Sequence, residues 1–315
     1  MYRQILVPLD GSRSAEAALP VAAYLAGRLG AAITLFHALE RDAPDQVHGE
    51  RHLTTVAEAE VYLAQAEERW LGAGESTTAR HVHEAGIGDV AGCIVDHGRE
   101  LGADLIVMCT HGRSGPRHWV WGSLAQQVLA RDGAHVLLLR PPASPAEAKY
   151  ELRHVLVPLD GAAMHEEGLW AAAELAKPCA ADLRLLSVVP TRSSLSGDQA
   201  AAGKLLPSAM KEILDVAEQS AADYLADLSK ALEARGLPTS REVRRGDPAE
   251  EIAESAQSRP VDLIALATHA RAGIEAFWTR SVGPRVSART RTPLLLVPVR
   301  DTHPEKGNLT SPAGV

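Results

Sequence analysis

The chain carries the sequence Ile5-Leu6-Val7-Pro8-Leu9-Asp10-Gly11 near its start and repeats it almost unchanged as Val155-Leu156-Val157-Pro158-Leu159-Asp160-Gly161. Four further pairs of segments follow in the same order: Gly88-Asp89 with Gly246-Asp247, 103–107 with 261–265, Thr110-His111 with Thr268-His269, and 137–139 with 294–296. Five matching segments at a nearly constant offset indicate that one domain has been duplicated.

The length of 315 residues agrees with two domains, at roughly 100–200 residues per domain. We predict a first domain over residues 1–142 and a second over 150–300. The stretch between them is rich in Pro, Ala and Ser, and its prolines resist both helix and sheet. Residues 301–315 are polar and are expected to form a flexible tail.

Short apolar runs alternate with segments of helical spacing inside each copy. In the first copy we predict strands at 3–9, 33–39, 79–84, 104–109 and 135–140, and helices at 12–29, 54–71, 89–101 and from 123 onward. The strands are continuously apolar, which is typical of a parallel sheet covered on both faces. The predicted fold class is therefore α/β, doubly wound, in two tandem copies.

Composition and charge exclude several classes of protein. The 32 Lys and Arg residues against 40 Asp and Glu give a net charge of −8, which disfavours nucleic-acid binding. No apolar run approaches the ~18 residues of a membrane helix, and the apolar start is too brief for a signal peptide. Three scattered cysteines form neither a disulfide framework nor a zinc site. These features predict a cytoplasmic protein that binds neither nucleic acid nor membrane.

In an open parallel sheet, ligands bind outside the carboxyl ends of the strands. Here the loop after the fourth predicted strand reads Thr110-His111-Gly112-Arg113-Ser114-Gly115-Pro116, and nine residues separate Gly112 from Gly122-Ser123. Glycines and a helix N-terminus both favour an anion such as phosphate, although an ordinary loop explains the pattern equally well. Asp10 faces the same crevice, either as a cap of the next helix or as a ligand contact.

The quoted motifs together resemble the universal stress protein family over essentially the whole chain, twice. The resemblance implies a strand order of 3-2-1-4-5, as in the adenine-nucleotide alpha-hydrolase-like fold, and pairing of the domains through their last strands. It also implies ATP as the ligand, with Mg left open. The ATP-binding members carry Gly, two residues, Gly, nine residues and then Gly-Ser or Gly-Thr. The resemblance then implies a nucleotide-binding set in the first domain: Pro8, Asp10, Ala38, Cys109, Gly112, Arg113, Gly115, Gly122 and Ser123.

Two departures from the family pattern affect this prediction. Cys109 occupies the position of the first glycine. It is either a buried structural thiol or a redox thiol activated by the nearby helix N-terminus. In the second copy Ala267, Ala270 and Arg280 replace all three glycines, which predicts a degenerate site there despite Asp160.

The sequence therefore predicts a stress-response protein that binds ATP in its first domain and acts as a nucleotide-dependent regulator. A nucleotide-free scaffold closed by Cys109 and a slow ATPase remain as alternatives, with no catalytic residue assigned. We expect Leu137–Leu139 and Leu294–Leu296 to pair within one chain, and leave a homodimer open. The histidine pairs 81/83, on one strand face, and 48/52, at helical spacing, lack a third ligand and are interpreted as surface histidines rather than a metal site.

Overall fold

The computed structural model describes residues 2–40, 46–47, 50–72, 78–84, 89–110, 123–131, 134–141, 150–191, 207–269 and 282–299. The first half contains β1 (Gln4–Pro8), α1 (Arg13–Glu16), α2 (Leu19–Leu29), β2 (Ala32–Leu39), β3 (Gln46–Val47), β4 (Glu50–Arg51), α3 (Val56–Trp70), β5 (Thr78–Glu84), α4 (Val90–Glu100), β6 (Leu105–Cys109), α5 (Ser123–Ala130) and β7 (His135–Leu139). The second half contains β8 (His154–Leu159), the 3-10 turn η2 (Ala163–His165), α6 (Glu166–Cys179), β9 (Asp182–Val189), α8 (Pro207–Glu233), β10 (Thr239–Arg245), α9 (Pro248–Ser258), β11 (Leu263–His269), α11 (Val282–Arg289) and β12 (Leu294–Val299).

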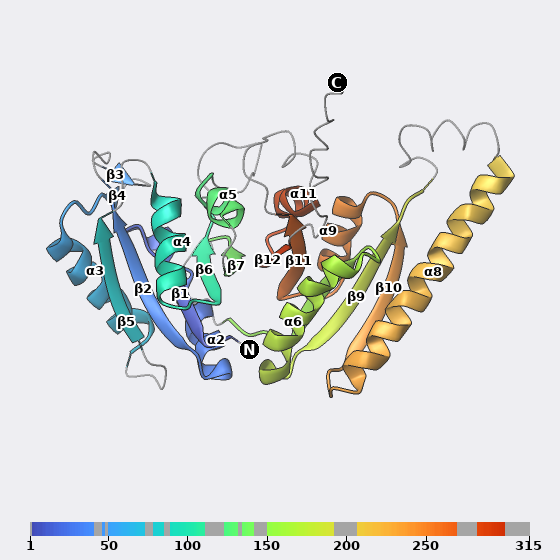
Figure 1. Cartoon of the computed structure of the whole chain (residues 1–315), viewed down its shortest axis with the longest axis horizontal. Helices are drawn as coiled ribbons and strands as arrows, with labels where there is room; N and C mark the ends of the chain where they lie inside the picture. The colour runs from blue at the N-terminus through green and yellow to red at the C-terminus, as the bar shows by residue number, and fades with distance from the viewer. Residues whose placement is uncertain are drawn as a thin grey trace, which may run out of the picture.

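Ten strands form one sheet in the order β10-β9-β8-β11-β12-β7-β6-β1-β2-β5. Each half of this sheet is parallel and follows the order 3-2-1-4-5, so the predicted fold class is confirmed. At the centre β7 and β12 pair antiparallel, with Leu137 opposite Leu295. In Figure 1 the β5 and β10 edges accordingly lie at opposite ends of the molecule, each beside its own helix, α3 or α8.

Helices cover both faces of the sheet, and alternate residues of each strand serve the two faces. In β1, Ile5 and Val7 join one core cluster with α2, α3, α6 and α8, whereas Leu6 joins the other with α4, α5, α9 and α11. All three side chains are fully buried. Burial on both faces explains why these strands are continuously apolar in sequence. Among the residues that the structure describes, no helix is both long and apolar enough to cross a membrane.

The segment predicted as one helix over 12–29 is two helices, so that prediction is wrong in detail. Ser12 caps α1 by accepting the Ala15 amide hydrogen, and α1 ends at Glu16. Pro20 lies in the first turn of α2, where its missing N–H removes no helical hydrogen bond. The proline therefore sets the start of a second helix, which ends as predicted at Gly30 with φ +66°.

A buried carboxylate on α1 joins this helix to α3 on one face of the first domain. Glu16 is 4% exposed, and its Oε2 accepts hydrogen bonds from Arg69 Nη1 at 2.7 Å and from Trp70 Nε1 at 2.8 Å. The second domain keeps this arrangement, since Glu166 accepts a hydrogen bond from the Tyr224 hydroxyl.

We expect Glu16→Ala to lower the free energy of unfolding by about 1–3 kcal/mol, because it leaves the indole N–H of Trp70 without its acceptor. Urea denaturation followed by circular dichroism measures this change. Asp96→Ala is the control, because the Asp96 carboxylate is 67% exposed and its ion pair with Arg99 contributes little. Equal midpoints for the Glu16→Ala and Asp96→Ala proteins would contradict the role of the buried carboxylate.

Candidate functional site

A cavity of about 120 Å³ lies at the carboxyl ends of β1, β2 and β6 in the first domain. Its walls are made by Pro8, Leu9, Asp10, Ala15, Phe36, His37, Ala38, Glu40, His52, Val90, Ile94, Met108, Cys109 and Leu124. This is the end of the sheet where ligands bind in doubly wound folds. The volume is below the ~300–1,000 Å³ of a typical small-molecule site, so the cavity has room for part of a nucleotide.

Four residues of the predicted set meet in this cavity: Pro8, Asp10, Ala38 and Cys109. Ser123 is the first residue of α5, and Leu124 beside it contributes to the wall. Gly112, Arg113, Gly115 and Gly122 lie outside the described residues, so their part in a site stays a prediction.

Asp10 forms the turn that precedes α1. Its Oδ1 accepts the backbone N–H of Ser12 at 2.9 Å, while the Ser12 hydroxyl performs the helix capping. The alternative that Asp10 itself caps the helix is therefore wrong. The carboxylate is half-buried at the cavity wall, where it can also meet a ligand.

Cys109 ends β6 and is 8% exposed. Burial raises the pKa of its thiol to about 12, and the nearby negative charge of Asp10 adds to this effect. The thiol therefore stays protonated near neutral pH, whereas a reactive cysteine needs a lowered pKa. This result favours the buried structural thiol over the redox alternative.

Two histidines that sequence reasoning did not assign to the site contribute to the same wall. His37 Nδ1 lies 2.7 Å from the Leu9 carbonyl oxygen, which can only accept, so Nδ1 carries the proton and Nε2 is an acceptor. Burial lowers the pKa of His37. Both His37 Nε2 and His52 Nδ1 are buried, and neither has a hydrogen-bond partner among the described residues. A histidine inside the apolar run 33–39 was the available signal.

His52 also corrects a prediction. It precedes α3, which begins at Val56, and belongs to no helix, so the expected helical face shared with residue 48 is wrong; residue 48 itself lies outside the described residues. The short strands β3 and β4 take up part of this segment. Helical spacing alone was a poor guide here, because two polar positions four residues apart also fit a turn between strands.

The second copy has a different set of contacts at the equivalent turn. Asp160 occupies the position of Asp10 and accepts the Ala162 N–H at 3.0 Å, as Asp10 does with Ser12. However, the Asp160 carboxylate also binds His165 Nδ1 at 2.8 Å, and this bond raises the pKa of His165. The residue equivalent to His165 in the first copy is Ala15, a small side chain on the cavity wall.

A larger cavity, of about 620 Å³, lies near the amino ends of the strands. Tyr2, Asp104 and His135 line it from the first domain, and Trp170 of α6 lines it from the second. Its position at the opposite end of the sheet separates it from the predicted nucleotide residues. It therefore contributes nothing to the candidate site.

The protein consists of two doubly wound α/β domains, each with strand order 3-2-1-4-5. The first domain has a crevice at the carboxyl edge of its sheet. These features define the class of this protein. The model of the universal stress protein family matches residues 1–140 and again 151–298. The chain belongs to the universal stress protein family, as a tandem member.

Individual relatives agree with this assignment. The universal stress protein MJ0531 of Methanocaldococcus jannaschii is 26% identical over 145 residues, which are 46% of this chain and 81% of that protein. The universal stress protein YxiE of Bacillus subtilis is 28% identical over 147 residues, 45% of this chain and 97% of that protein. A universal stress protein structure from Archaeoglobus fulgidus shares the fold with a TM-score of 0.66 at 15% identity, covering 94% of this chain and 98% of that one.

Proposed function

We propose that the first domain binds ATP in the crevice at the carboxyl ends of β1, β2 and β6, and that the protein acts as a nucleotide-dependent regulator. The observation that carries the proposal is the meeting of Pro8, Asp10, Ala38 and Cys109 around one cavity. A cytoplasmic location is part of the proposal, since all three cysteines are unpaired thiols.

The chemistry of the cavity suits the nucleoside part of ATP. Phe36, Ile94 and Met108 offer apolar surface to a base. The Nε2 of His37, which has no partner among the described residues, can accept a hydrogen bond from an exocyclic amine or a ribose hydroxyl. An acidic residue such as Asp10 is a common ribose partner. A ligand would satisfy buried polar atoms that otherwise carry a desolvation cost.

The phosphates are proposed to lie outside this cavity, toward the first turn of α5, which begins at Ser123. Backbone N–H groups at a helix N-terminus attract phosphate. Hydrolysis would further need a metal clamp and transition-state cations, and the proposal assigns no residue to either role.

Titration of the full chain with ATP by calorimetry tests the proposal. We expect one ATP per chain, with binding weakened about tenfold or more by Asp10→Ala and left unchanged by Asp160→Ala. Asp160→Ala is the matched control, because Asp160 supports the same turn in the second copy. Two ATP per chain would contradict the assignment to one domain, and no binding at all would favour the scaffold alternative.

We also propose that the two domains pair through their last strands within one chain in solution. The antiparallel register of β7 and β12 supports this, because Leu137 and Leu295 stand directly opposite each other and both are fully buried. Separation of the domains would expose two apolar edge strands, which invite pairing with other chains.

The double variant Leu137→Cys/Leu295→Cys, in a background without the three natural cysteines, is expected to form a disulfide on mild oxidation. Facing residues of an antiparallel pair meet the Cα separation that a disulfide needs. A denaturing gel should show a monomer-sized band with altered mobility, and Leu139→Cys/Leu295→Cys, which is out of register, should not cross-link. A dimer-sized band alone would mean that the strands pair between chains.

A further inference from the structure

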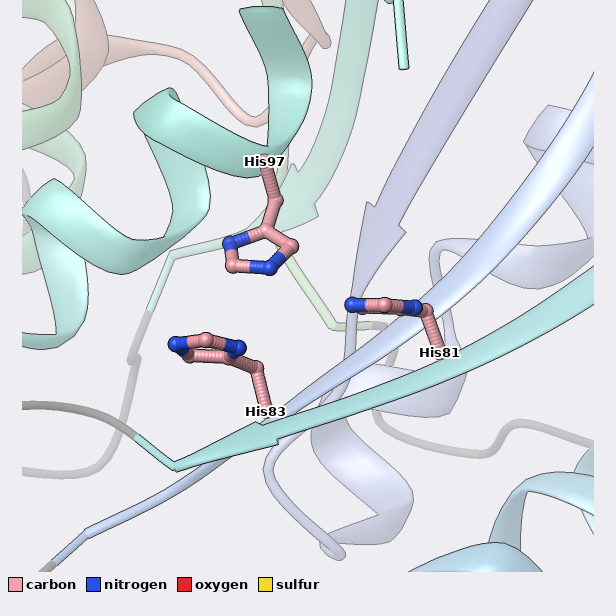
Figure 2. A group of neighbouring side chains, drawn as sticks. All are labelled: His81, His83 and His97. Carbon is pink, nitrogen blue, oxygen red and sulfur yellow. The ribbon is translucent and has the colours of Figure 1, made fainter. Parts of the chain in front are cut away.

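Three imidazoles gather on the face of the first domain that carries α4. His81 and His83 stand on one side of β5, and His97 reaches them from α4 (Figure 2). One ring nitrogen of each histidine lies within 4.8 Å of the others. The expected common face of His81 and His83 is therefore present, and the third ligand that the sequence did not reveal is His97.

Local contacts prepare His97 to act as a ligand. Its Nδ1 lies 2.9 Å from the Cys93 carbonyl oxygen, so Nδ1 carries the proton and donates to this oxygen. The lone pair is then on Nε2, which points into the space between the other two rings (Figure 2). A backbone carbonyl that fixes the tautomer and ring orientation in this way is the usual outer-shell partner of a metal-bound histidine.

His81 provides a second, independent observation. Its Nε2 is buried and has no hydrogen-bond partner in the part of the chain that the structure describes. The ring also stacks on Phe36 with centroids 6.0 Å apart, which limits its rotation.

The duplicated domain shows what the same framework looks like when its polar groups satisfy one another. The strand register and helix caps make Glu242, Arg244 and Ser255 the equivalents of His81, His83 and His97. There the Ser255 hydroxyl donates to Glu242 Oε2 at 3.0 Å, and Arg244 Nε donates to Glu242 Oε1 at 2.5 Å. The second domain thus holds a closed ion-pair cluster, whereas the equivalent positions of the first domain hold three imidazoles.

We propose that His81, His83 and His97 bind a divalent transition-metal ion of the zinc class. Metal–nitrogen bonds of about 2.0–2.1 Å in a tetrahedral site place the ligand nitrogens about 3.4 Å apart, so the rings must close by up to about 1.4 Å. His83 is exposed and can make this movement. Glu100, whose Oε2 lies 3.7 Å from His97 Nε2, is a candidate carboxylate for the fourth position, and water is the alternative. The site does not depend on nucleotide binding.

Titration of the chelator-treated full chain with Zn²⁺, against a chromophoric competitor, tests the proposal. We expect one high-affinity Zn²⁺ per chain, and Co²⁺ should give the visible absorption of a four-coordinate nitrogen and oxygen site. His83→Ala should weaken Zn²⁺ binding by at least ~100-fold, above the ~10–100-fold that loss of an outer-shell partner costs. Because His83 is exposed, this variant is expected to fold normally. Retained ATP binding by the His83→Ala protein serves as a separate check of its fold.

His154→Ala is the matched control, because it removes a half-exposed histidine of the second domain that contacts Asp182. Its Zn²⁺ affinity should equal that of the unaltered protein. Zn²⁺ should also raise the melting temperature of the unaltered and His154→Ala proteins but not of the His83→Ala protein. Unchanged Zn²⁺ affinity in His83→Ala, or no binding by the unaltered chain, would overturn the proposal.

Discussion

Replacing Ala15 with histidine is expected to abolish ATP binding by the full chain, with a loss of affinity of about 100-fold or more. The second copy shows the reason, because His165 occupies the equivalent position and binds the carboxylate of Asp160 at 2.8 Å. An imidazole at position 15 would bind Asp10 in the same way. It would also fill a cavity of only about 120 Å³ whose wall Ala15 forms. Calorimetric titration with ATP measures the loss.

Ala15→Ser is the control for this substitution, because it adds a polar atom without the volume or charge of the imidazole. We expect the Ala15→Ser protein to bind ATP within a few-fold of the unaltered chain. The Ala15→His protein should keep its circular dichroism spectrum, since His165 is accommodated at the same point of the second domain. Full ATP affinity in Ala15→His would show that the nucleotide lies elsewhere.

Gly168→Ala is expected to destabilise the second domain by about 2 kcal/mol, although alanine favours helices over glycine. Gly168 belongs to α6, which lies against β11. A Cβ at this position would lie 2.8 Å from the backbone nitrogen of Ala267, and neither a helix nor a central strand can move aside cheaply. Chemical denaturation measures the loss of stability, and hydrogen exchange of the β11 amides shows where it occurs.

Gly98→Ala on α4 is the matched control. Gly98 is also a buried helical glycine, but the nearest atom to its added Cβ lies 3.7 Å away, at an ordinary contact distance. Its helix should therefore be stabilised by up to about 1 kcal/mol. If both variants behaved alike, the close packing of α6 on β11 would not be the cause.

The residue pattern alone was sufficient to predict the duplicated α/β architecture. The apolar runs that begin at Ile5 and Val155, with their shared Asp-Gly ends, are local features of the sequence. Because these strands are buried on both faces of the sheet, they are continuously apolar and can be recognised without a structure. The same holds for the helix end at Gly30, where φ +66° favours glycine. The strand order came from the family resemblance, and the sheet agrees with it.

The family resemblance implied a common site for Pro8, Asp10, Ala38 and Cys109. These residues line one cavity because strands of a parallel sheet end at a common edge. Sequence reasoning missed His37 and His52. Which side chains at such an edge turn into a cavity, and whether another group satisfies their nitrogens, depends on packing between segments far apart in the chain.

The sequence by itself determined the repeat, from its matching segments, and the fold class, from local periodicity. It also determined which chain segments approach the crevice, because ligands bind at the carboxyl ends of parallel strands. Only the tertiary structure decided that His165 occupies the carboxylate of Asp160 and that His97 joins His81 and His83. The pairing of α4 with β5 brings those three rings together across a sheet face. Neither periodicity nor spacing encodes such a contact, because the relative position of a helix and a strand is set by the side chains packed between them.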